Sequence, residues 1–131
     1  MTARKRRQRA SVRVPRWVKL PALPESFHTQ LGDVPVTIVE RIAPRPGEKV
    51  DEDESVMGVW RPEVREVEIK SGMHGATMWQ TLWHERVHCA LFDAGVKLTH
   101  DQEESVSDAI ASHIVCDMID VLSASARARG G

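Results

Sequence analysis

Two histidines and a glutamate lie close together in His84-Glu85-Arg86-Val87-His88, which is an H-E-x-x-H pattern. Residues four positions apart in a helix lie about 40° apart on one face, so the imidazoles of His84 and His88 can reach a single cation. Glu85 is about 100° round the helix from His84, where its carboxylate can take a proton from a metal-bound water. The pattern therefore predicts Zn2+ as the cofactor, His84 and His88 as ligands and Glu85 as the catalytic base.

A second acidic pair offers the third protein ligand that a catalytic zinc ion needs. Glu104 follows His88 by sixteen residues, and Asp108 comes one helical turn after Glu104. A buried carboxylate pair without partners would be strongly destabilising, whereas a metal ion and the second ring N–H of a histidine ligand would satisfy both groups. We therefore expect Glu104 to bind the metal and Asp108 to orient a histidine ligand. The face that carries both carboxylates continues through apolar residues, namely Ala111, Val115, Ile119 and Leu122.

Three other polar residues near these motifs carry separate predictions. His100 precedes Glu104 by four positions and is the alternative third ligand. Glu103 is followed one turn later by Ser107 and not by an acid, so we expect it to point away from the site. His113 is about half a turn round from Glu104 and is expected to face away as well. A helix N-terminus favours acidic residues through its dipole, but this does not explain an acid that faces the core one turn later.

The remaining sequence predicts an α+β domain that positions these groups. Short runs rich in β-branched residues predict strands at 34–42, 56–60 and 64–70. Longer apolar patterns predict one helix over 76–92, which carries the zinc motif, and another over 101–122, which carries Glu104. We therefore expect a small sheet of about three strands, mainly antiparallel, packed on the zinc-site helix with the glutamate-bearing helix beside it.

The ends and the surroundings of the two helices can also be predicted. Gly95 is a suitable C-terminal stop for the first helix, and Thr99 is a suitable N-cap for the second in a capping box. Apolar side chains surround nearly all of the first helix, with Arg86 as the main exception, so this helix is expected to be packed on most sides. Cys89 and Cys116 fall within these helices and are expected to be buried free thiols.

The charge distribution divides the chain of 131 residues into a basic arm and an acidic body. We expect residues 1–30 to form a flexible arm, residues 31–123 a single domain and residues 124–131 a flexible tail. The acidic run at 51–54 is expected in a solvated loop. Residues 4–19 can make weak contacts with nucleic acid through phosphates, the alternative being a solubilising tail. Eight basic and no acidic side chains lie in residues 1–20: Arg4, Lys5, Arg6, Arg7, Arg9, Arg13, Arg16 and Lys19.

The sequence gives no expectation of a membrane protein. No apolar run approaches the roughly 20 residues that cross a bilayer. The stretch at 18–24 is too short and too rich in proline to be the apolar core of a signal peptide. We therefore expect a cytoplasmic protein.

The two helical motifs together resemble those of the gluzincins, the metallopeptidases with H-E-x-x-H followed by E-x-x-x-D. The resemblance extends over about residues 34–122 and is strongest to small single-domain zincin-like proteins of phages and prophages, whose zinc helix follows a segment like 59–69. It implies a twisted sheet over the zinc helix, an edge strand along the cleft, and hydrolysis of a peptide or protein substrate in extended conformation. On this basis the strand at 64–70 is expected to pair with the substrate backbone.

The chain departs from the larger gluzincins in one respect. Those enzymes stabilise the oxyanion with a Tyr or His from a downstream domain, and this chain contains no Tyr and no such domain. His74, His100 or an arginine is expected to act instead, and the sequence does not select among them. The alternative is a non-catalytic zincin-like scaffold or a nucleic-acid-associated module that uses the basic arm.

Overall fold

The computed structural model describes residues 12–43 and 56–129. Predictions for the tip of the basic arm, for the acidic run at 51–54 and for the last two residues fall outside these ranges. The described chain contains four strands followed by two helices. In order, they are β1 (Ser26–Thr29), β2 (Gly32–Val39), β3 (Gly58–Arg61), β4 (Glu66–Lys70), α1 (Gly75–Ala94) and α2 (His100–Ala128).

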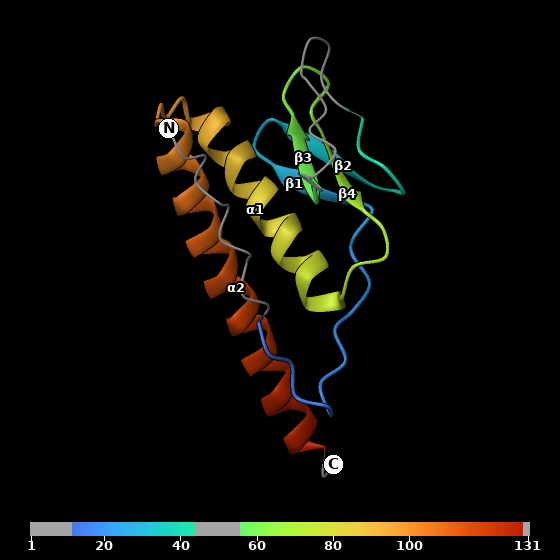
Figure 1. Ribbon diagram of the computed structural model, residues 1–131. Helices are drawn as coiled ribbons and strands as arrows, with labels where there is room; N and C mark the ends of the chain where they lie inside the picture. The colour runs from blue at the N-terminus through green and yellow to red at the C-terminus, as the bar shows by residue number, and fades with distance from the viewer. Residues whose placement is uncertain (1–11, 44–55, 130–131) are drawn as a thin grey trace, which may run out of the picture.

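Helix α1 lies between the sheet and α2, so the molecule has three layers (Figure 1). The helix packs against β3 and β4 on one side and against α2 on the other. This arrangement explains why its apolar residues are distributed round the whole helix, and it confirms the prediction of a helix packed on most sides. Among its buried side chains, Trp79, Leu82 and Cys89 belong to the main core.

The sheet has the strand order β1-β2-β4-β3. Strands β1 and β2 form an antiparallel hairpin, β2 and β4 pair in parallel, and β4 and β3 pair antiparallel. The α+β class is confirmed, but the sheet has four strands and not three, and it is mixed. The strand that was not predicted is β1, whose sequence Ser-Phe-His-Thr buries only Phe27 and lacks a β-branched alternation.

The inner face of the sheet is built on the alternation in β4. Val67 and Ile69 are completely buried, as predicted, and Val34 of β2 is buried to the same extent. Burial of each of these side chains contributes about 1.5–3 kcal/mol relative to leaving it in water. These three side chains therefore anchor the sheet against α1.

Two predicted domain limits fall inside elements of structure. Strand β1 lies within the segment 1–30 that was predicted as an arm, and the β1–β2 hairpin crosses residue 31. Helix α2 continues to Ala128, past the predicted start of a tail at 124. Residues 12–25 form no regular strand or helix, but Val18 is buried and the indole Nε1 of Trp17 donates to the hydroxyl of Ser123 on α2.

The link between the helices determines where the acidic residues lie. Gly95 adopts a left-handed conformation with φ of 68°, and its N–H and that of Val96 bond to the last carbonyls of α1, which ends the helix. The hydroxyl of Thr99 accepts from the N–H of Gln102 while the Gln102 side chain accepts from the N–H of Thr99, so the predicted capping box is confirmed. Because the link is short, α2 returns beside α1 and its first turns lie next to the H-E-x-x-H motif.

Helix α2 buries only one side. Ala111, Val115 and Ile119 face α1 and are buried, as predicted, whereas Cys116 is exposed, so its predicted burial is wrong. Within the described residues, α2 is also the one helix long and apolar enough to cross a membrane by length and composition. The core helix of a soluble protein that meets the same criterion is mostly buried, whereas 17% of this window of α2 is buried.

Candidate metal site

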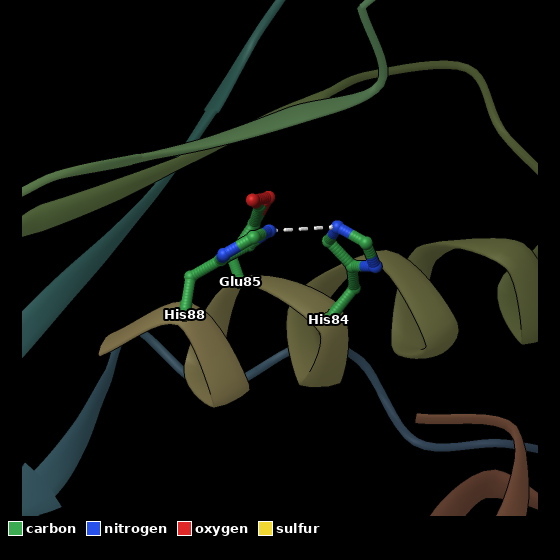
Figure 2. A group of neighbouring side chains, drawn as sticks. All are labelled: His84, Glu85 and His88. Atoms are coloured by element: carbon green, nitrogen blue, oxygen red, sulfur yellow. Dashed lines mark hydrogen bonds between the residues drawn. The ribbon is translucent and has the colours of Figure 1, made fainter. Parts of the chain in front are cut away.

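His84, Glu85 and His88 form a group that can hold a metal ion (Figure 2). Their ligand atoms all lie within 4.8 Å of one another, and the two rings meet with Nε2 of His84 and Nε2 of His88 3.0 Å apart. The i, i+4 spacing on α1 produces this meeting, as the sequence predicted. His84 and Glu85 are buried, so the group lies within the fold and not on an exposed helix surface.

Glu104 of α2 completes the group from the second helix. Its Oε1 lies 3.0 Å from Nε2 of His88, and its Oε2 lies 3.2 Å from Nε2 of His84. The same two ring nitrogens therefore face each other and a carboxylate. A neutral imidazole carries only one N–H, so protons on the two rings cannot form a hydrogen bond in every one of these contacts. A single cation, in contrast, can accept an electron pair from all three groups at once.

Glu85 is the member of this group that lies between the two histidines in the sequence of α1. Its side chain is buried, and in Figure 2 its carboxylate lies next to the His88 ring, on the side toward the sheet. This is the position that the helical geometry predicted, adjacent to the ligands and about 100° round from His84.

The outer ring nitrogens of both histidines face carboxylates on α2. Oδ1 of Asp108 lies 2.7 Å from Nδ1 of His84, although the ring N–H is not aligned with it as a hydrogen bond. Oε2 of Glu103 lies 3.5 Å from Nδ1 of His88. The prediction that Glu103 points away from the site is therefore wrong. The prediction considered only the helix face that carries Glu104. The second nitrogen of the His88 ring, Nδ1, points toward Glu103, which is the residue before Glu104 on α2.

The charges of the group perturb the pKa values of two members. Burial lowers the pKa of His88, but the hydrogen bond with Glu104 and the charges of Glu85, Glu104 and Glu103 together raise it above the ordinary value. Hydrogen bonds from His84 and His88 hold the pKa of Glu104 far below its ordinary value. The raised pKa of His88 means that the surrounding carboxylates favour positive charge at its ring, which either a proton or a metal ion can supply.

Strand β3 passes directly over Glu85. A Cβ on Gly58 would lie 2.5 Å from Cγ2 of Thr81 and 3.3 Å from Cγ of Glu85, so only glycine allows this approach. Further along the strand, Trp60 makes an edge contact with Phe92 of α1. Because Thr81, Glu85 and Phe92 lie on one side of α1, β3 runs beside the metal group.

The position of β4 contradicts one prediction about the substrate. The strand predicted at 64–70 was expected to pair with a substrate, but β4 lies between β2 and β3 and both of its edges are occupied. In the described part of the chain, the strand with an open edge on this side of the sheet is β3.

His74, His100 and His113 were the subjects of separate predictions. His74 precedes α1 and is ten residues from His84, which is about 15 Å along the helix. His100 is exposed at the start of α2, one turn before Glu104, and Glu104 is the residue that contacts both rings. His113 is exposed, as predicted.

The basic arm is described only in part. Arg13, Arg16 and Lys19 are exposed, and the basic residues at 4–9 lie outside the described ranges. The prediction of nucleic-acid contact through residues 4–19 stays a prediction.

No family model, curated protein or solved structure matches this chain. The interpretation of the site therefore depends on its own geometry.

Proposed function

We propose that this chain is a zinc-dependent metallopeptidase of the zincin-like type, with His84, His88 and Glu104 as the zinc ligands. The observation that supports this most directly is the close approach of the three donor groups. Nε2 of His84 and Nε2 of His88 are 3.0 Å apart, Oε1 of Glu104 lies 3.0 Å from Nε2 of His88, and the other carboxylate oxygen, Oε2, lies 3.2 Å from Nε2 of His84. A tetrahedral zinc ion with bonds of about 2.0–2.2 Å separates its ligand atoms by about 3.3–3.6 Å. Each of the three contacts is within a few tenths of an ångström of that separation, with a different oxygen of Glu104 facing each ring.

The remaining residues of the site have distinct roles in this proposal. A zinc ion held by His84, His88 and Glu104 would supply a bound water with its pKa lowered toward about 7 and a Lewis acid for the scissile carbonyl. Glu85 takes the proton from that water and passes a proton to the leaving amine. Asp108 and Glu103 hold the imidazoles of His84 and His88 with Nε2 directed at the metal, because each lies at the opposite nitrogen of its ring.

The edge of β3, with which no other strand of the described chain pairs, supports a peptide substrate over other zinc-enzyme substrates. A free strand edge presents backbone N–H and C=O groups that pair with an extended chain. Since β3 runs past Glu85 at Gly58, a chain paired with it would bring a peptide bond close to the ligands. Affinity that comes from backbone pairing predicts broad sequence tolerance.

The test compares Glu85→Gln with the wild-type chain. The variant keeps the shape of the side chain but cannot take a proton, so it should bind zinc as tightly as wild type and lose cleavage of an unstructured, fluorescently labelled casein. Glu63→Gln is the matched control, because Glu63 is exposed in the turn between β3 and β4. If Glu85→Gln cleaves as fast as wild type, the proposed role of Glu85 is wrong. If the wild type binds zinc but cleaves no member of an unstructured peptide library, the chain is a non-catalytic zinc-binding scaffold.

A further inference from the structure

A pocket lies on the opposite side of α1 from the metal group. It has a volume of about 450 Å3 and lies where β1 and its turn meet α1 and α2. Arg86 lines it and is about 200° round α1 from His84 and about 160° from His88. Its volume is within the range of small-molecule sites, about 300–1,000 Å3. This pocket is therefore separate from the proposed zinc site.

The walls of this pocket are mainly apolar and aromatic. Phe27 and Leu31 line it from the first hairpin, Trp83 and Ala90 from α1, and Ile114 from α2. Leu31 is two-thirds exposed at the turn between β1 and β2, although it is a large apolar residue. An apolar ligand body would therefore be covered on several sides.

Arg86 is the charged group of this pocket that has no acidic partner among residues 12–43 and 56–129. Its guanidinium carbon lies 4.0 Å from the ring centroid of Trp83 and 4.5 Å from that of Phe27, so it packs over both rings. Within the described residues, its N–H groups make no hydrogen bond or ion pair. Burial lowers its pKa, with only a small opposing influence from Cys89. A half-buried guanidinium without an anionic partner is unfavourable, and an anion in the pocket would relieve this.

Arg65 and Arg61, in contrast to Arg86, both have acidic partners. Arg65 forms two hydrogen bonds with Asp93, at 2.7 and 3.0 Å. Arg61 donates to Glu68 and to the carbonyl of Ala43. Asp93 also lines the pocket, but Arg65 already neutralises its carboxylate. Asp33 lies beside His28, its side chain is mostly exposed, and it does not line the pocket. The local charge at the pocket is therefore the positive charge of Arg86.

We propose that this pocket binds a small monocarboxylate with an apolar, preferably aromatic, body. The carboxylate of the ligand accepts hydrogen bonds from the N–H groups at the edge of the Arg86 guanidinium. The apolar body of the ligand packs against Trp83 and Leu31. Aromatic packing uses the faces of a guanidinium and leaves its edges free for a planar, bidentate acceptor. A carboxylate is favoured over a phosphate because a single cation matches a single negative charge. The proposal does not depend on the zinc site.

The experiment titrates the full chain with hydrocinnamate while the indole N–H resonance of Trp83 is followed in an isotope-labelled sample. The neutral analogue hydrocinnamyl alcohol tests the role of the charge, and phenyl phosphate tests the preference for a carboxylate. Each titration is carried out with one equivalent of zinc and again in EDTA, because a carboxylate can also bind to a zinc ion. A saturable, zinc-independent shift with a Kd of about 1 mM or below is expected for hydrocinnamate, with weaker binding of both analogues.

Two variants test which residues form the site. Arg86→Met keeps an unbranched apolar stem over the rings and removes the charge, and it should weaken hydrocinnamate binding about ten- to a hundredfold. Ala90→Phe fills the pocket and leaves Arg86 in place, so it should also abolish binding. Ala109→Phe is its matched control at an exposed alanine of α2 outside the pocket, and it should bind like wild type.

Several results would overturn the proposal. These are equal binding of the alcohol or the phosphate, a response that requires zinc, unchanged binding by Arg86→Met, or no saturable response. If Arg86→Met does not fold, the Ala90→Phe and Ala109→Phe pair decides the question. Unchanged binding by a folded Ala90→Phe places any carboxylate site elsewhere.

Discussion

Oδ1 of Asp108 lies 2.7 Å from Nδ1 of His84, on the other side of the imidazole from the nitrogen that faces Glu104. The ring of His84 is thus flanked by two carboxylates from consecutive turns of α2. One carboxylate is located to share a cation with the ring, and the other is located to hold the ring in orientation. Glu103 has the corresponding relation to His88, at 3.5 Å.

The first prediction concerns these orienting carboxylates. Asp108→Ala should lower zinc affinity about ten- to a hundredfold, as loss of a group that orients a metal-binding histidine commonly does. Glu103→Ala should have a smaller effect, because its contact is longer. Competition with a chromophoric zinc chelator measures both. Asp117→Ala is the control, since Asp117 is exposed and half a turn round α2 from Asp108. Equal affinities for Asp108→Ala and Asp117→Ala would contradict the assigned role.

The second prediction concerns the approach of β3 to Glu85. Gly58→Ala should lower the free energy of unfolding by about 1–3 kcal/mol, because the new Cβ would lie 2.5 Å from Cγ2 of Thr81. Adding Thr81→Ser removes that methyl group and should restore most of the loss. Gly75→Ala is the control, since its Cβ would meet nothing closer than 3.8 Å.

Urea unfolding of these three variants provides the measurement. A Gly58→Ala protein as stable as wild type would show that β3 does not lie as close to α1 as described here.

The third prediction selects the group that stabilises the oxyanion. His100 lies one turn before Glu104 and on the same side of α2, about 6 Å along the helix axis, whereas His74 is about 15 Å from His84. We infer that His100 acts in this role. His100→Ala should lower kcat about a hundredfold or more with zinc affinity unchanged, and His74→Ala should do neither. A loss of zinc in His100→Ala would instead make His100 a ligand.

The fourth prediction concerns the pH dependence of stability. In the zinc-free protein, the raised pKa of His88 contributes stability that is complete below the unfolded value of about 6.5 and is lost as the pH rises through the folded pKa. The lowered pKa of Glu104 contributes stability that is present above about 4.5 and is lost only as the pH falls through the folded pKa. The pair therefore stabilises the zinc-free fold most between these two values.

Zinc reverses this trend, because it binds only the neutral imidazoles. The increase in Tm caused by zinc should be larger at a pH of about 7.5 than at about 5.5, and the His84→Ala variant should show little increase at either. Thermal unfolding with and without zinc measures this difference. An increase that is as large at the lower pH would mean that zinc binds elsewhere.

Local sequence patterns were sufficient to predict much of this site. The spacing of His84 and His88 on a helix fixes their common face, and the carboxylates of Glu104 and Asp108 were predicted from their position on an otherwise apolar face. The caps at Gly95 and Thr99 were predicted because they depend on backbone groups within one turn.

Features that depend on contacts between distant segments could not be predicted in this way. Strand β1 gains its stability from pairing with β2 and from one buried ring at Phe27, and neither appears as a periodic pattern. The parallel pairing of β2 with β4 leaves β3 at the edge of the described sheet, which is the edge where we propose that a substrate strand pairs. The contact of Glu103 depends on the rotation of the His88 ring, which residue spacing does not specify.

The zinc content of the purified chain and of three variants tests the central claim most directly. Wild type and Glu85→Gln should each retain one zinc ion per chain after desalting, as measured by elemental analysis. Glu104→Ala should bind zinc more weakly than Asp108→Ala does, because it loses a ligand and not only an orienting group. A wild-type chain that retains no zinc, or a Glu104→Ala variant that binds zinc as tightly as wild type, would contradict the account.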